Sequence, residues 1–254
     1  LSLPWEIIHP EPLRIFCFTI HNYPFSIYAP TMLPPLPPRP SDGHKGTFGR
    51  ILIVGGNQAM IGAPAFPGYA ALRMGSGLVQ IATPQSILPY CLNICPELIG
   101  LPLGNSAGKD DLLDAANKAD AVVIGPGLGQ SPPALARLKS LIRLKDKPMV
   151  LDADALNLLS KQKQWPTSFR ARAVLTPHPG EMKRLTRLLN VNSPEIPADD
   201  AGRLKIATLA ARTFQSVILL KGHRTVITDG HQHHFNTTGD SALLNAQPIR
   251  VDST

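Results

Sequence analysis

The chain has 254 residues, 43% of them hydrophobic and 17% charged, so it is long and apolar enough to bury a sizeable core and is not a disordered protein. Three cysteines without a C-x-x-C pair exclude a disulfide scaffold and predict a reducing, cytoplasmic location, and no apolar run is long enough to cross a bilayer. The net charge of +7 is scattered along the chain, which favours a solvated surface; if it serves binding, a phosphate-bearing small molecule is as good a candidate as nucleic acid.

The first 31 residues differ from the rest of the chain. They hold six of its 14 aromatic residues (2 Trp, 4 Tyr and 8 Phe in total), and Pro4, Pro10, Pro12 and Pro24 interrupt every period. A signal peptide is a poor explanation, because the apolar core is short and no small-x-small cleavage site follows it. Met32 stands just before a proline-rich stretch that predicts an extended lead-in. We therefore expect residues 1–31 to be an extension outside a domain that spans 32–254.

From Arg50 onward, short β-rich apolar runs alternate with amphipathic stretches. This alternation predicts right-handed βαβ crossovers and a mainly parallel sheet with helices on both faces. Two further runs flank Asp229-Gly230, which predicts an antiparallel hairpin at the end of the sheet. The predicted strands are 51–54, 78–82, 121–124, 149–151, 173–175, 217–220, 225–228 and 233–236, and the predicted helices are 63–74, 110–118, 133–144, 155–161, 180–190 and 199–213.

Glycine-rich turns follow two of the predicted strands. The strand 51–54 runs into Gly55-Gly56-Asn57, with Gly62-Ala63 before the next helix, and the strand 121–124 runs into residues 125–129, Gly-Pro-Gly-Leu-Gly. Glycines at the carboxyl ends of parallel strands let backbone N–H groups approach an anion, although glycines also serve simply as tight turns. The spacing is not that of a dinucleotide fingerprint, nor is there a P-loop, so the turns favour phosphate binding of another kind.

Ionisable residues follow three more strands. Asp152 and Asp154 stand at a strand–helix junction, where one of them is expected to cap the helix. His178 lies between two prolines that restrict its backbone, and Glu181 three residues later is a helix cap or a Mg²⁺ ligand. The segment 221–225, Lys-Gly-His-Arg-Thr, suits nucleotide phosphates but is also compatible with a solvated turn. The histidines at 231, 233 and 234 indicate an exposed polar turn rather than a metal site.

Six motifs follow one another along the chain: His44-Lys45-Gly46-Thr47-Phe48-Gly49-Arg50; Gly62-Ala63 with Leu72-Arg73-Met74-Gly75-Ser76-Gly77-Leu78-Val79; Gly125-Pro126-Gly127-Leu128-Gly129; Leu151-Asp152-Ala153-Asp154-Ala155-Leu156-Asn157; Thr176-Pro177-His178-Pro179-Gly180-Glu181; and Lys221-Gly222-His223-Arg224-Thr225. Taken together and in order, they closely resemble the ADP- or ATP-dependent (S)-NAD(P)H-hydrate dehydratase family, which has a carbohydrate-kinase-like domain of the ribokinase superfamily. The resemblance covers about residues 33–239.

The resemblance implies a ribokinase-like three-layer αβα sandwich and a metabolite-repair lyase that restores NADH or NADPH from its hydrate. It implies ADP or ATP and Mg²⁺ as cofactors and a small-molecule substrate, without nucleic acid or membrane partners; family members often form homo-oligomers. Glu181 matches a position linked to Mg²⁺ in the superfamily, which is the weakest of these transfers. The implied hydrate-binding residues are Ala63, Gly127 and His178, and the implied nucleotide-binding residues are Lys221, Gly222, His223, Arg224 and Thr225.

The chain departs from the family pattern after the hairpin. Residues 236–239, Asn-Thr-Thr-Gly, still match, but the G-[ST]-G-D segment that supplies the catalytic base and an anion hole does not follow. Without gaps, the position of the catalytic Asp is occupied by Arg250, and Asp240 lies ten residues too early to replace it. We therefore predict no catalytic residue in the expected place, a domain that lacks its last helices, and impaired turnover.

Two other functions are compatible with the same motifs. The first is a pseudoenzyme that binds nucleotide or NAD(P) without turnover, as the loss of the catalytic Asp would produce. The second is another ribokinase-like kinase acting on a small alcohol, which His178 between its prolines and the segment 221–225 argue against.

Overall fold

The structure, a computed structural model, describes residues 38–104, 109–145, 147–163, 165, 169, 172–189 and 195–237. The predicted extension 1–31, the predicted domain boundary at residue 32, and Asp240 and Arg250 lie outside these residues. The elements are η1 (Lys45–Phe48), β1 (Arg50–Val54), α1 (Ala65–Arg73), β2 (Leu78–Pro84), α2 (Leu88–Ile94), β3 (Ile99–Leu103), α3 (Lys109–Lys118), β4 (Ala121–Ile124), α4 (Pro132–Leu141), β5 (Pro148–Leu151), α5 (Asp154–Leu159), β6 (Arg172–Leu175), α7 (Pro179–Leu185), η2 (Thr186–Leu188), α8 (Asp200–Phe214), β7 (Val217–Leu220), β8 (Thr225–Thr228) and β9 (His233–Asn236).

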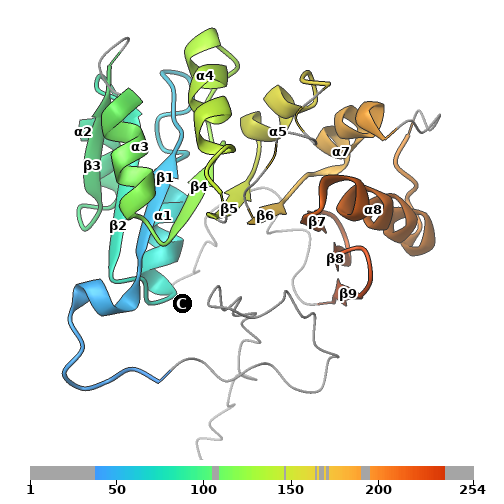
Figure 1. Ribbon diagram of the computed structural model, residues 1–254, viewed down its shortest axis with the longest axis horizontal. Helices are drawn as coiled ribbons and strands as arrows, with labels where there is room; N and C mark the ends of the chain where they lie inside the picture. Colours follow the sequence, from blue (N-terminus) through green and yellow to red (C-terminus); the bar gives the residue numbers. More distant parts are fainter. Residues whose placement is uncertain are drawn as a thin grey trace, which may run out of the picture.

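The strands form one sheet in the order β3-β2-β1-β4-β5-β6-β7-β8-β9 (Figure 1). Each neighbouring pair from β3 to β7 is parallel, whereas β8 pairs antiparallel with β7, and β9 antiparallel with β8. The predicted parallel sheet with an antiparallel end is therefore confirmed. Within the described residues, no helix is long and apolar enough to cross a membrane.

The sequence reading missed α2 and β3. Both contain residues that normally discourage their type of structure: Pro89 in the helix, and Gly100 and Pro102 in the strand. Proline is tolerated in the first turn of a helix, where its missing N–H has no partner in any case. Proline is also tolerated in a strand at the edge of a sheet, and β3 is the first strand of this one.

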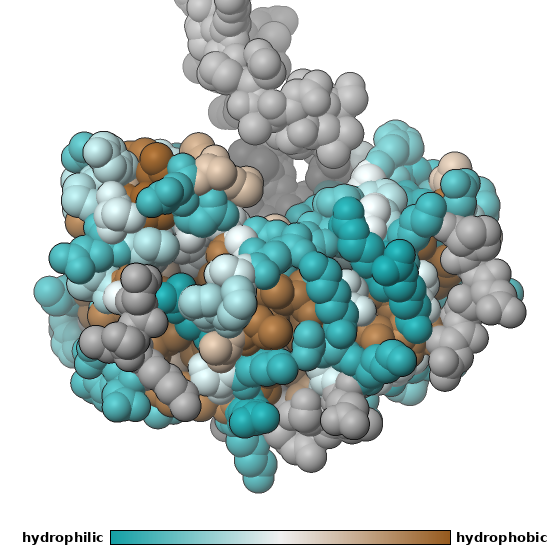
Figure 2. Space-filling view, turned by 90° about the horizontal axis from the view of Figure 1, so that it is seen from above, coloured by the Kyte–Doolittle hydropathy of each residue, from teal (hydrophilic) through white to brown (hydrophobic). Residues whose placement is uncertain are grey.

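Side chains that alternate along β1 and β2 contribute to a separate core on each face of the sheet. Leu52 and Val54 of β1 belong to the larger core, which also contains residues of α3, α4, α5, α7 and α8, whereas Ile53 belongs to a smaller core with residues of α1 and α2. The helices thus form the two outer layers of the predicted sandwich (Figure 1). Seen from the side of α3, α4 and α5, the surface is mostly hydrophilic, with hydrophobic residues in the hollows between (Figure 2).

The two described cysteines, Cys91 in α2 and Cys95 at its C-terminal cap, are buried in the smaller core. Burial is the main cause that raises the pKa of each thiol above its ordinary value. Because the thiolate is the nucleophile, a raised pKa leaves both side chains protonated and unreactive near neutral pH. We expect iodoacetamide to label them at least about tenfold more slowly in the folded protein than in urea, as measured by peptide mass mapping. Equal labelling rates in the two conditions would contradict this placement.

Candidate active site

The five loops that carry the sequence motifs lie side by side at one edge of the sheet. They follow β1, β4, β5, β6 and β7, which are parallel and consecutive in the strand order, so their carboxyl ends share that edge. In open parallel sheets this edge is where ligands bind. Five motif-bearing loops that lie far apart in the sequence are therefore brought into one row, as the sequence predicts. Residues 44–49 and 72–77, which belong to the other motif segments, precede β1 and β2 and lie at the opposite edge.

At the β1–β4 end of this row, Ala63 and Gly127 are in contact. A Cβ on Gly127, whose φ is +63°, would lie 2.7 Å from the Cβ of Ala63, so only glycine fits here. Asn57 fixes the approach of the two loops: its Nδ2 donates to the Gly127 carbonyl at 2.8 Å, and its Oδ1 accepts from the Ala59 amide at 2.7 Å. Two of the three predicted hydrate-binding residues thus form one small, tightly packed surface.

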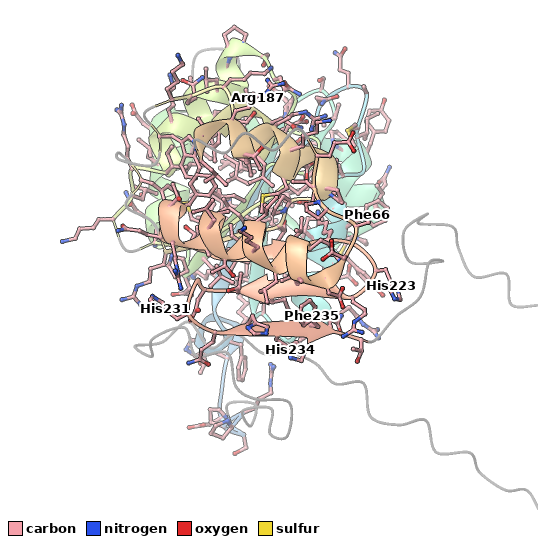
Figure 3. The ribbon with its side chains drawn as sticks, turned by 90° about the vertical axis from the view of Figure 1, so that its right-hand side faces the viewer. Phe66, Arg187, His223, His231, His234 and Phe235 are labelled. Carbon is pink, nitrogen blue, oxygen red and sulfur yellow. The ribbon has the colours of Figure 1, made fainter. Side chains whose placement is uncertain are left out.

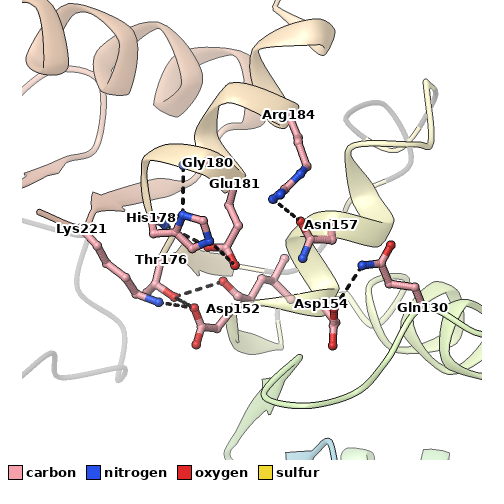
Figure 4. A network of polar contacts seen from close by, with 11 residues as sticks. Gln130, Asp152, Asp154, Asn157, Thr176, His178, Gly180, Glu181, Arg184 and Lys221 are labelled. Atoms are coloured by element: carbon pink, nitrogen blue, oxygen red, sulfur yellow. Dashed lines mark hydrogen bonds and ion pairs between the residues drawn. The ribbon is translucent and has the colours of Figure 1, made fainter. Parts of the chain in front are cut away.

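The third predicted hydrate-binding residue, His178, follows β6, two strands away from β4 or roughly 10 Å. It caps α7: its Nδ1 accepts from the Gly180 amide at 3.0 Å. Glu181 completes a capping box by accepting from the His178 amide at 2.9 Å, and its other oxygen lies 3.4 Å from His178 Nε2. The imidazole is consequently fixed in orientation while 51% of its side chain stays exposed at the edge (Figure 4).

Asp152 and Asp154, which follow β5, bond to neighbouring loops instead of capping their own helix. The N-cap of α5 is Ala153, without a side-chain hydrogen bond, so the expected aspartate cap is absent. Asp152 Oδ1 accepts from Lys221 Nζ at 2.5 Å and from Thr176 Oγ1 at 2.8 Å. Asp154 Oδ2 accepts from the Gly129 amide at 2.8 Å. The reason is the backbone of Ala153, whose φ of +47° turns the two carboxylates out of the capping position.

The segment 221–225 connects β7 to β8, and its carbonyl groups accept hydrogen bonds from a buried arginine. Arg203 of α8, 6% exposed, donates to the carbonyls of Leu220 at 3.2 Å, Lys221 at 3.4 Å and Arg224 at 3.3 Å, and also to that of His223. The Lys221 amide donates to the Pro177 carbonyl at 2.9 Å, which joins this segment to the loop of His178.

The side chains of the same segment face the solvent to different degrees. Lys221 is 40% exposed and Arg224 is 46% exposed, with Arg224 Nε 3.1 Å from Asp200 Oδ2. His223 is exposed, and Thr225 Oγ1 donates to the Gly222 carbonyl at 3.0 Å. The predicted nucleotide-binding residues therefore form one ordered loop with two cations at its surface.

The other histidines of the hairpin lie away from this loop. His231 is at the turn between β8 and β9, at the opposite end of the hairpin from His223 (Figure 3). Asp229 closes that turn by accepting from the amides of His231 and Gln232 at 2.8 and 2.7 Å. No three His, Cys, Asp or Glu side chains gather as a metal centre anywhere in the described part of the chain.

The fold and this edge define a ribokinase-like α/β protein, a class in which ligands lie across the carboxyl ends of the strands. The comparisons with known proteins are specific: a family model described as NAD(P)H-hydrate dehydratase matches residues 51–246. The chain belongs to this NAD(P)H-hydrate dehydratase family, which confirms the resemblance found in the motifs.

Individual relatives agree with this assignment. The chain is 34% identical over 214 residues to the ADP-dependent (S)-NAD(P)H-hydrate dehydratase of Neisseria meningitidis, with 82% of this chain and 68% of that protein covered. It is 40% identical over 220 residues to a bifunctional NAD(P)H-hydrate repair enzyme of Moorella thermoacetica, with 83% of this chain covered. The chain spans 40% of the length of that bifunctional relative and 39% of a second one from Coxiella burnetii.

A solved structure gives the same result. The ADP/ATP-dependent NAD(P)H-hydrate dehydratase of Bacillus subtilis, co-crystallised with ATP and Mg²⁺, superposes with a TM-score of 0.67 at 31% identity. The superposition covers 83% of this chain and 72% of that one. A ribokinase-like superfamily protein of Enterococcus faecalis superposes with a TM-score of 0.65 at 28% identity.

The sequence reading missed two residues that organise this edge. Arg203 lies in the helical stripe that also buries Ile206, Ala207 and Ala210, and a cation at such a core position could have been noticed. Asn57 was read only as part of a glycine turn, and nothing in its spacing indicates that its amide reaches Gly127, 70 residues away.

Proposed function

We propose that the chain uses ADP or ATP to dehydrate the S epimer of hydrated NADH or NADPH. In this proposal Ala63, Gly127 and His178 contact the hydrate, and the segment 221–225 contacts the nucleotide. The observation that supports it is the hydrogen bond from the Lys221 amide to the Pro177 carbonyl, 2.9 Å long, which makes the segment 221–225 a direct neighbour of His178. A phosphoryl group held at the first loop is then next to a hydroxyl held at the second.

The proposed chemistry answers a simple difficulty: hydroxide is a poor leaving group. Transfer of the terminal phosphoryl group from the nucleotide to the hydroxyl of the hydrate turns that oxygen into part of a phosphate ester. Elimination then breaks the C–O bond and a C–H bond on the neighbouring carbon, releases inorganic phosphate and a proton, and restores the reduced nicotinamide. Phosphoryl transfer depends mainly on positioning and on charge neutralisation, which fixed side chains such as Lys221 provide.

Mg²⁺ is part of the same proposal, with Glu181 as its protein ligand. Both oxygens of Glu181 already face His178, and the side chain is 5% exposed, so the described residues do not form a metal cage. They are compatible with an ion that arrives with the nucleotide, since Mg²⁺ commonly takes one or two carboxylates together with phosphates and water. Such an ion would neutralise charge on the phosphates.

The sequence after Gly239 supports a second candidate, a protein that binds nucleotide or NAD(P) without turnover. Arg250 stands where the family pattern predicts the catalytic Asp. The loss of one oxyanion-hole donor alone typically lowers turnover by ~10²–10³, and a lost base lowers it further. We therefore propose that this chain turns over slowly or not at all, although it keeps its binding loops.

Two measurements separate these functions. The protein is mixed with hydrated NADH, ADP or ATP and Mg²⁺, and the absorbance of reduced nicotinamide is followed; calorimetry measures nucleotide binding in parallel. A slow rise supports an impaired dehydratase, and binding without product supports the non-catalytic protein. A turnover equal to that of the Bacillus subtilis enzyme would refute the role given to Arg250. No binding of either ligand would overturn the proposed function itself.

His178 provides a separate test of the hydrate site, because its imidazole both caps α7 and faces the edge. We expect His178→Asn to keep the cap, since asparagine is a good N-cap residue, and to weaken hydrate binding at least about tenfold. His178→Ala should lose the same binding and also about 1 kcal/mol of stability in urea denaturation. If the Asn variant binds the hydrate as the unmodified protein does, His178 is only a helix cap.

Assembly into a homo-oligomer stays a prediction. It is supported by large hydrophobic side chains that are exposed on and before α1 and on α2, since such groups often mark contacts between chains. They include Phe66 at 65%, Tyr90 at 58% and Met60 at 52%. Light scattering of the purified protein measures the assembly directly.

A further inference from the structure

Asp152 lies at the centre of the edge but has no role in the site described so far. Its Oδ1 accepts from Lys221 Nζ at 2.5 Å and from Thr176 Oγ1 at 2.8 Å. The carboxylate therefore joins residues that follow three different strands, β5, β6 and β7 (Figure 4). We propose that Asp152 is a positioning residue, which holds the Lys221 ammonium in place for the phosphates of a nucleotide; this inference rests on the proposed function.

The first argument is the flexibility of lysine. A lysine side chain has four rotatable carbon–carbon bonds, and freezing it upon ligand binding weakens the binding. The ion pair with Asp152 fixes the Lys221 side chain before any ligand arrives. An ammonium has three N–H donors, and the bond to Asp152 uses one of them, so two remain for phosphate oxygens. The side chain of Lys221 is still 40% exposed, which leaves these donors accessible.

The second argument is the way in which Asp152 itself is held. Its side chain is 26% exposed, less than that of its lysine partner, and Thr176 donates to the same oxygen that receives Lys221. The next residue, Ala153, has φ +47° and ψ −117°, a combination rarely adopted by residues other than glycine. This backbone directs Asp152 toward Lys221 and Asp154 toward the Gly129 amide, 2.8 Å away. An ordinary surface ion pair has no such support.

The test is a double-mutant cycle on nucleotide affinity, measured by calorimetry with ADP and with ATP. We expect Asp152→Ala to weaken nucleotide binding about three- to tenfold, the usual effect of leaving one long side chain to be ordered by the ligand. In a Lys221→Met background the same Asp152→Ala change should have no further effect on affinity. A loss that adds fully to that of Lys221→Met would show a general structural role and overturn the proposal.

A second variant distinguishes positioning from charge. Asp152→Asn keeps an oxygen that can accept from Lys221 and Thr176 but removes the negative charge near the phosphates. Positioning predicts that Asp152→Asn stays within about twofold of the unmodified protein. If the carboxylate merely repels phosphate, both variants bind nucleotide more tightly, and the proposal fails.

A matched control comes from α3, where Asp114 and Lys118 form an exposed ion pair of 2.7 Å. Asp114→Ala breaks an Asp–Lys pair on a helix that carries none of the five loops, and nucleotide affinity should not change. If the unmodified protein binds neither ADP nor ATP, the proposed function is refuted. If the unmodified protein binds nucleotide and Asp152→Ala binds it equally well, only the positioning role of Asp152 is refuted.

Discussion

Arg203→Met is expected to destabilise the protein by about 3 kcal/mol and to abolish measurable nucleotide binding. The guanidinium donates to four carbonyls of residues 220–224 and is 6% exposed, so the methionine would leave those carbonyls without their partner inside the protein. A Cβ on Gly222 would lie 2.9 Å from Arg203 Nη2, so the guanidinium also supports this glycine directly. Urea denaturation measures the stability, and calorimetry with ADP measures the binding.

Arg212 of the same helix provides the control. Its Nε donates to the Gly230 carbonyl at 2.7 Å, at the other end of the hairpin from the segment 221–225. Arg212→Met removes an equivalent side chain, with an expected loss of about 1 kcal/mol and unchanged nucleotide affinity. If the two variants lose nucleotide binding to the same extent, then Arg203 stabilises the helix in general and has no special relation to the segment 221–225.

Gly125→Ala is expected to cost at least about 3 kcal/mol and to impair the hydrate and nucleotide sites together. The φ of Gly125 is +128°, and a Cβ at this position would lie 1.8 Å from the carbonyl oxygen of Asp152. Relief of that clash would push apart the loops after β4 and β5. Because Asp152 bonds to Lys221, the displacement should reach the segment 221–225 as well. Stability and the affinities for both ligands are measured on the same preparation.

Gly49→Ala separates the clash from the backbone strain. Gly49 has a φ of +82°, but the nearest atom that a Cβ at this position would meet is a side-chain oxygen of Asp120, 3.6 Å away. Its substitution should therefore cost only the ~1–3 kcal/mol of a backbone conformation (φ +82°, ψ 155°) that is normally restricted to glycine. Gly49 precedes β1, at the opposite edge of the sheet from the five loops, so ligand affinities should not change. If Gly125→Ala lowers the stability no more than Gly49→Ala does, the close approach of Gly125 to the Asp152 carbonyl is refuted.

The arrangement of the strands was largely predictable from the sequence, because buried strands and glycine turns follow simple patterns. Each predicted strand has a counterpart, and the hairpin was correctly predicted from Asp229-Gly230. The elements α2 and β3 were missed because proline has a low propensity for both helices and strands, and a sequence pattern counts Pro89 and Pro102 against them. The free-energy cost of a proline, however, depends on its position within the helix or the sheet. Only the structure shows that Pro89 is in the first turn of α2 and that Pro102 is in an edge strand.

The residues of the candidate site were predictable from the sequence, but the hydrogen bonds between them were not. Glycines, His178 and Lys221 stand at strand ends, and the rule for parallel sheets brings them together. The partners of Asp152 and Asp154 were not predictable, since both depend on the φ of +47° at Ala153, a residue type that gives no sign of it. The expectation that one of the two aspartates caps the helix was therefore reasonable but wrong.

The hydrogen bonds from Arg203 to the carbonyls of residues 220–224 also fix the orientation of the peptide groups in the segment 221–225. In a trans peptide the N–H points opposite to the C=O, so carbonyls of Lys221 and His223 that turn inward oblige the amides of Gly222 and Arg224 to turn outward. Outward-pointing amides are dipoles that attract anions even when no side-chain charge is present. A residual affinity for inorganic phosphate should thus survive the removal of the lysine charge, with a weak dependence on ionic strength.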